Sequence, residues 1–122
     1  VPGTITCSRD AVKPAEFHHF TTPPAIARMR TDARAMLDNA GYLLKQLHAR
    51  FPERSATRAN SLSNTIFFKC PSDVIVRKYS LATMHLSVQG RRENFAHVVV
   101  MPHVTRSVLD RFLDDLDGSR AA

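Results

Sequence analysis

Apolar residues recur at steps of three and four through the first half of the chain. From Ala25 onward they fall at Ile26, Met29, Ala33, Leu37, Ala40, Leu44, Leu47 and Phe51. This spacing is that of one face of a helix. The Thr-Thr-Pro-Pro segment 21–24 is typical of a helix start, and Pro52 lacks the amide donor that continuation of the helix needs. The pattern predicts one long helix over residues 23–52.

The second half of the chain alternates short apolar runs with helical spacing. Residues 64–69 are β-branched and aromatic and predict a strand, whereas residues 73–86 carry apolar side chains at helical steps and predict a helix. After a charged turn over 89–94, the nearly continuous apolar run 95–101 predicts a strand covered on both faces. Thr105 can cap a closing helix. The expected fold class is α/β, a long helix followed by a small two-layer domain with the order strand, helix, strand, helix.

Two polar stretches separate these patterns. Residues 53–63 show no periodicity and predict a linker, and residues 1–22 predict a loop followed by a short helix. The chain therefore divides into 1–22, 23–52, 53–63 and 64–122. A chain of 122 residues can bury one core, but it is too short for a large enzyme. It begins with Val1 and reads from its first residues like the interior of a protein, so we expect a fragment or a processed chain.

Composition narrows the possible environments. Seventeen Lys and Arg against eleven Asp and Glu give a formal charge of +6, but the basic residues of the long helix are interleaved with Asp32 and Asp38. A solvated helix face is therefore favoured over a nucleic-acid groove, and a basic nucleic-acid-binding domain is the weaker alternative. We expect no membrane span, because no apolar run approaches about 18 residues. Cys7 and Cys70 are isolated, without the neighbouring Cys or His ligands of a zinc site, so we expect no metal, reduced thiols and a cytoplasmic location.

The residues alone offer few candidates for chemistry. The sequence carries none of the common hydrolase, metalloprotease, phosphate-loop or dinucleotide motifs. Segment 4–10 combines hydroxyls, amides and a guanidinium, which are the groups that hold a phosphate or a carboxylate. His97 and His103 flank the end of the predicted apolar strand, where a packing role is the commoner outcome.

Three blocks, in order, resemble one enzyme family. Thr-Ile-Thr-Cys-Ser-Arg at 4–9 resembles a T-I-x-G-S-R loop, and 63–82 resembles S-x-T-V-x-F-x-x-P-S followed by I-V-R-K-W-x-L-A. Residues 96–116 resemble A-H-V-V-V-M-P-x-V-T followed by L-D-x-F-L-x-x-L. All three are similar to the pyridoxal-phosphate-dependent group II amino-acid decarboxylases, in the branch of bacterial histidine and plant serine decarboxylases.

The resemblance implies the C-terminal portion of a fold-type I enzyme. Segment 1–22 would end the large cofactor domain, 23–52 would be an interdomain helix, and 64–122 would be the small C-terminal domain. The family implies pyridoxal 5'-phosphate as cofactor, an amino-acid substrate, and a homodimer with its active site at the subunit interface. Its cofactor lysine lies in a Ser-x-His-Lys motif that this chain lacks. We therefore expect no catalytic residue here, and a chain that is inactive alone or is completed by a separate large-domain chain.

The resemblance also carries roles to four residues. Ser8 and the amide at Cys7 would contact the cofactor phosphate of the neighbouring subunit, while Arg9 would hold the loop or the interface. Cys7 stands where the family usually has Gly, which adds a side chain where the backbone approaches closely. His97 would bind the substrate carboxylate, with a packed structural histidine as the alternative.

Overall fold

The computed structural model describes residues 11–120, which divide into two compact units with the boundary between Asp32 and Ala33. The helices and strands follow in chain order: α1 (Val12–Phe20), α2 (Pro23–Arg50), the 3-10 turn η2 (Pro52–Arg54), β1 (Thr57–Arg58), β2 (Thr65–Lys69), α3 (Asp73–Lys78), β3 (Ala82–Val88), β4 (Arg91–Val99) and α4 (Arg106–Arg120). The proposed division of the chain into domains at residues 22, 52 and 63 stays a prediction.

The first unit contains α1 and the start of α2. Within this described part α1 buries none of its residues. It ends at Thr21, whose backbone N–H and hydroxyl both donate to the carbonyl oxygen of Phe17, at 3.1 and 2.8 Å. The Thr22 hydroxyl donates to the carbonyl oxygen of His19 at 2.9 Å, and the two prolines that follow occupy the first positions of α2. The predicted start of the long helix is confirmed.

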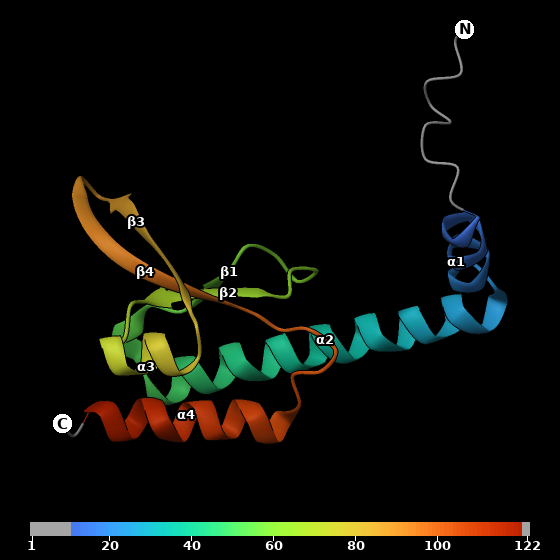
Figure 1. Ribbon diagram of the computed structural model, residues 1–122. Coiled ribbons are helices and arrows are strands. Elements are labelled where there is room, and N and C mark those ends of the chain that lie inside the picture. The colour runs from blue at the N-terminus through green and yellow to red at the C-terminus, as the bar shows by residue number, and fades with distance from the viewer. Residues whose placement is uncertain (1–10, 121–122) are drawn as a thin grey trace, which may run out of the picture. The chain divides into compact units, whose positions relative to one another are not determined.

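The second unit is built on one antiparallel sheet. Its strand order is β1-β2-β4-β3, and every neighbouring pair is antiparallel. Figure 1 shows α3, α4 and the C-terminal half of α2 on one side of this sheet. The unit thus has two layers, sheet and helices, and the predicted α/β class is confirmed.

The core lies between these layers. Its fully buried side chains come from all the main elements: Leu43, Leu47, Phe51, Ile66, Phe68, Ala96, Val100, Leu113 and Leu116. Each contributes about 1.5–3 kcal/mol when it is fully removed from water, with less for alanine. The prediction of a buried apolar face on the long helix is confirmed for the second half of that helix. Ile26 and Met29 in the first half are exposed, at 37% and 50% of their surface.

The helix predicted over 73–86 is wrong after its first half. α3 ends at Lys78, because Ser80 adopts the left-handed conformation (φ 50°) and the Leu81 N–H donates to the carbonyl oxygen of Val76 at 2.9 Å. Such a stop usually carries Gly, so the sequence gives no marker for it. Residues 82–88 form β3 instead.

Three further predictions need correction. The turn predicted over 89–94 is only Gln89 and Gly90, both at positive φ, and it makes β3 and β4 a tight hairpin. The predicted linker 53–63 contains η2 and the short edge strand β1. The apolar run of β4 is only partly covered on its second face: Ala96 on the helix side is fully buried, whereas on the other face Phe95 is 7% exposed and Val99 is 42% exposed.

Candidate functional site

The sheet face away from the helices is apolar. Residues directly opposite each other in antiparallel strands point to the same face, and Phe67 lies opposite His97 while Met84 lies opposite Phe95. Their neighbours two positions away share that face. We define the open face by these residues: Phe67, Ala82, Met84, Leu86, Val88, Phe95 and His97.

A groove of about 690 Å³ runs along the open face. Its walls are the side chains of Phe67, Met84, Leu86, Val88 and Phe95, together with segment 55–59. These walls are almost entirely apolar, which is the composition of a binding surface rather than of a solvated sheet face.

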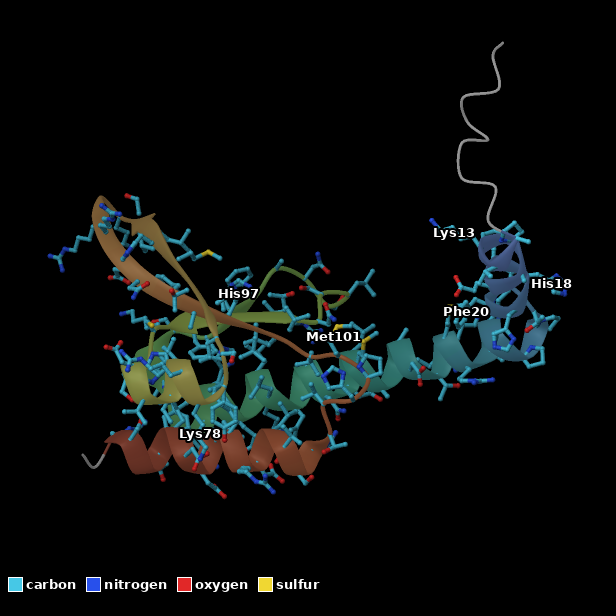
Figure 2. All side chains as sticks on the ribbon, in the orientation of Figure 1. Lys13, His18, Phe20, Lys78, His97 and Met101 are labelled. Atoms are coloured by element: carbon cyan, nitrogen blue, oxygen red, sulfur yellow. The ribbon has the colours of Figure 1, made fainter. Side chains whose placement is uncertain are left out.

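His97 lies on the open face between Phe67 and Ala82, and Lys69 and Glu93 are further polar residues of the same face. Figure 2 shows His97 on the side of β4 away from α2 and α4. Its ring contacts that of Phe67, with centroids 5.7 Å apart, and its Nδ1 is buried without a hydrogen-bond partner among the described residues. Leaving a buried polar atom unpaired costs about 1–3 kcal/mol. His97 therefore carries one buried ring nitrogen that its own domain leaves unpaired among the described residues.

A second cavity, of about 330 Å³, lies between α4 and the loop that joins α3 to β3. It is lined mainly by apolar residues, among them Leu81, Val104 and Phe112, and His97 and Tyr79 are its two titratable residues. Its position at the end of β3 puts it beside Val98 and Val99, which have no partner on the β3 side of the sheet.

Tyr79 anchors one wall of this cavity. Its hydroxyl donates to a carboxylate oxygen of Asp115 on α4, which also pairs with the Lys78 ammonium at 2.7 Å. Burial and the Asp115 carboxylate raise the pKa of Tyr79 to about 12, so the phenol stays protonated. The Lys78 and Tyr79 hydrogen bonds hold the pKa of Asp115 below its usual value. This cluster joins α3 to α4, and it offers no group for proton transfer near neutral pH.

The lysines do not fit a cofactor site. All four lie in the described part of the chain: Lys13 and Lys45 are exposed, Lys69 pairs with Glu93 at 3.9 Å, and Lys78 pairs with Asp115. None of them lines the groove or the second cavity. The expectation that the cofactor lysine is absent rests on the missing Ser-x-His-Lys motif and stays a prediction.

Three predicted site residues, Cys7, Ser8 and Arg9, lie outside the described residues, and their roles stay predictions. Cys70 is free and half-buried, and burial raises the pKa of its thiol, which suits packing rather than nucleophilic chemistry. Across residues 11–120, no three His, Cys, Asp or Glu side chains gather as a ligand set. None of the helices in that range combines the length and the apolarity that crossing a membrane takes.

The groove residues Met84, Leu86, Val88 and Phe95 were not among the candidates from the sequence. A signal for them exists, because residues 82–88 alternate apolar and polar side chains at the period of a half-buried strand. Helical steps from Ile75 through Tyr79 compete with that alternation in the same stretch.

The described residues thus form a small two-layer domain with an apolar groove on one face of its sheet. No protein-family model matches the chain. It is 29% identical to histidine decarboxylase of Solanum lycopersicum over 118 residues, and 34% identical to serine decarboxylase 1 of Oryza sativa subsp. japonica over 119. These matches cover 96% and 97% of the chain but 26% and 22% of the relatives.

The solved structures agree with the sequence matches. L-methionine decarboxylase from Streptomyces sp. 590 matches with a TM-score of 0.65 and 31% identity, over 72% of the chain and 18% of that protein. The chain belongs to the pyridoxal-phosphate-dependent amino-acid decarboxylases and corresponds to their C-terminal part. It spans about a fifth to a quarter of the length of these relatives.

Proposed function

We propose that this chain is the part of a pyridoxal-phosphate-dependent decarboxylase that completes the active site of an enzyme releasing CO2 from an L-amino acid to give an amine. The observation that supports it most is the agreement of sequence and fold on one chemistry. The histidine and serine decarboxylases match by sequence, and the methionine decarboxylase matches by both sequence and structure.

The substrate of the whole enzyme follows less directly from this chain. The relatives are named for histidine, serine and methionine, whose side chains differ in size and charge. One C-terminal fold serves all three, so selection of the side chain depends mainly on other parts of the enzyme. What the substrates share is the α-carboxylate, and a group in this domain is best suited to that common feature.

His97 is our candidate for the carboxylate. Its Nδ1 has no hydrogen-bond partner among the described residues, and an imidazole N–H can donate to a carboxylate oxygen. Its role would be to bind and orient the substrate. The cofactor supplies the electron sink of the reaction when it is bound elsewhere in the enzyme.

The segment before the described residues supports the proposal through its chemistry. Ser8 and the amide at Cys7 would donate to the cofactor phosphate of a neighbouring subunit, with Arg9 holding the loop, in a cytoplasmic homodimer. Ser8→Ala should then weaken pyridoxal phosphate binding, measured by fluorescence titration of the assembled enzyme. Thr31→Ala, at an exposed position of α2, serves as the control and should leave the affinity unchanged.

The experiment for the function is a graft. The C-terminal part of the Streptomyces methionine decarboxylase is replaced by this chain, and CO2 release is measured with methionine, histidine and serine. We expect release from at least one of them. In the graft, His97→Ala should raise KM more than it lowers kcat, while His103→Ala, on an exposed loop, should change neither. A graft that loads cofactor but releases no CO2 from any of the three would contradict the proposal.

A second candidate is a partner-binding module that completes a decarboxylase carried on a separate large-domain chain. The apolar open face favours it, because such a face suits association with another folded body. Mixing this chain with a separately produced cofactor-binding chain should restore CO2 release, and an unchanged rate would count against assembly in trans.

A further inference from the structure

Strand β4 continues beyond the end of its pairing with β3. The two strands pair as far as Ala82 and His97, whereas β4 pairs with β2 as far as Val99. Figure 1 shows β4 running on past the point where the chain passes from α3 into β3. The stretch of β4 formed by Val98 and Val99 therefore has a free side, which we call the β4 edge, and both residues line the second cavity.

The backbone of Val99 faces the free side of the β4 edge. Along a strand, the N–H groups of successive residues point to opposite sides. The Val100 N–H donates to the carbonyl oxygen of Asn64 at 2.8 Å, which is on the β2 side. The amide of Val98 therefore also points to β2, and the amide of Val99 points the other way. Among residues 11–120, no strand pairs with Val99 on that side.

The β4 edge is not blocked by the features that commonly close a strand edge, which are Lys, Pro or a bulge. Residues 97–101 are His-Val-Val-Val-Met, and the register of β4 with both neighbours is regular up to the last pair. Such an edge can accept an extended segment as one more strand, the mode of recognition called β-augmentation.

The cavity beside the β4 edge suits one large apolar side chain. Helix α4 lines it with Val108, Leu109 and Phe112, and its volume is about 330 Å³. Ligand pockets span about 300–1,000 Å³, so this cavity lies at the small end of the range and fits a single side chain better than a cofactor. Val108 keeps 41% of its surface exposed although it is apolar. An incoming apolar group would cover that surface.

The free charge beside the cavity is positive. Arg111 directly precedes the cavity residue Phe112 and lies within electrostatic range of Tyr79 and Asp115. It forms no ion pair with any residue that the structure describes. The Asp115 carboxylate is already bonded to Lys78 and Tyr79. A segment with a carboxylate close to its apolar side chain is therefore favoured at this position.

We propose that the β4 edge and its cavity bind an extended segment of another protein, which adds a strand beside Val99, inserts one large apolar side chain and pairs a carboxylate with Arg111. This surface would recruit a partner protein, a role beyond the proposed decarboxylation. A second copy of the chain fits less well, because its own β4 edge would bring another Arg111 where a carboxylate is favoured.

Two adjacent amides give a matched test of the added strand. The probe is the synthetic peptide acetyl-Thr-Glu-Thr-Phe-Thr-Glu-Thr-amide, added to the isotopically labelled whole chain while amide hydrogen exchange is followed by NMR. In the free chain the Val99 amide should exchange fast and the Val98 amide slowly. The peptide should slow exchange at Val99 about tenfold or more and leave Val98 unchanged. An unprotected Val99 at about 1 mM peptide would overturn the proposal.

Two exposed valines on helices give matched variants for the cavity. Val108→Asp places a carboxylate at the cavity, whereas Val74→Asp places one on α3, where Val74 lines neither the groove nor the second cavity. Val108→Asp should weaken peptide binding about tenfold or more, and Val74→Asp should leave it unchanged. Equal binding by the two variants would overturn the proposal.

A change in the peptide tests the same contact without altering the fold of the chain. Replacing the Phe of the peptide by Ser should weaken its binding to the wild-type chain about tenfold or more, because the apolar contact with the cavity is lost. If Val108→Asp fails to fold, which fast exchange at Val98 would show, this peptide decides. Equal affinity of the Phe and Ser peptides would overturn the proposal.

Two other occupants of the β4 edge would give different results. Protection of Val99 that rises with the concentration of the free chain, without peptide, means that a second copy covers the edge. A methionine decarboxylase graft that folds but does not bind the peptide, measured by fluorescence with a labelled peptide, means that the rest of the enzyme covers it. Either result would overturn the proposal, and neither bears on CO2 release by the graft.

Discussion

The two faces of the sheet differ in what covers them, although both are apolar. Phe67 and Phe68 are adjacent on β2 and point to opposite sides. Phe68 is fully buried under the helices and packs its ring 6.0 Å from that of Phe112, whereas Phe67 lines an open groove. The residues of one face therefore form the core of this chain, and those of the other line a groove. The predictions below test that difference.

The largest expected effect is on the covered face. Phe68→Ala should lower the free energy of unfolding by about 3–5 kcal/mol, because it removes a fully buried ring and leaves a cavity. Phe67→Ala, its matched control on the open face, should cost less than half of that in the free chain. Urea denaturation of both variants measures the losses, and equal losses would show that the open face is already covered.

We expect a smaller loss of unfolding free energy when the hydrogen bond between Tyr79 and Asp115 is removed. Tyr79→Phe removes the hydroxyl bond to Asp115 and should cost about 1 kcal/mol, since Lys78 still partners the carboxylate. The folded pKa of Tyr79 is about 12, raised from 10.0, so its contribution is complete below pH 10 and is lost as pH rises through about 12. Alkaline unfolding curves should show this loss in the wild type and not in the variant. If the unfolding free energy of Tyr79→Phe falls with alkaline pH as steeply as that of the wild type, the loss does not come from the Tyr79 hydroxyl.

Low pH should also destabilise this cluster, through protonation of Asp115. The folded pKa of Asp115 lies below its ordinary value of 3.8, first because of the Lys78 bond, so its contribution is present above that value. It is lost as pH falls through the folded pKa. Asp115→Asn should reduce the acid dependence of the unfolding free energy, measured by urea titrations between neutral pH and pH 3. An undiminished slope would contradict the assignment.

The smallest effect is expected on the open face. Leu86→Lys and Ser87→Lys should each change the unfolding free energy of the free chain by no more than about 0.5 kcal/mol, because both positions are exposed. Leu86→Lys alone should lower aggregation, since it places a charge in the apolar groove. Light scattering at matched concentrations compares them. Equal aggregation would contradict the account of the groove.

The sequence predicted well where structure depends on local pattern. The long helix and β2 follow from spacing and from proline, and the closing helix follows from its cap, where the N–H of Val108 bonds to the Thr105 hydroxyl at 3.4 Å. The sequence-based prediction missed the β3–β4 hairpin, because Ala82 and Leu86, four residues apart, satisfy both helical and strand spacing. The left-handed residue that decides between them is Ser80 rather than Gly.

The site was harder to predict, because it depends on contacts between distant residues. His97 was a candidate through family resemblance, but its unpaired Nδ1 and its contact with Phe67 follow only from the register of β2 and β4. The groove could be located only from that register together with the pairing of β3 with β4. No local pattern states which of two apolar faces the helices will cover.

The central claim is that this chain completes a decarboxylase but does not carry its cofactor. The most direct test is to incubate the free chain with pyridoxal phosphate, reduce with borohydride, and locate the modified lysines by mass spectrometry, with the methionine decarboxylase graft as the positive control. We expect no saturable modification at Lys13, Lys45, Lys69 or Lys78, and saturable modification of a lysine that the graft contributes. Saturable, stoichiometric modification of any one of the four would contradict the account.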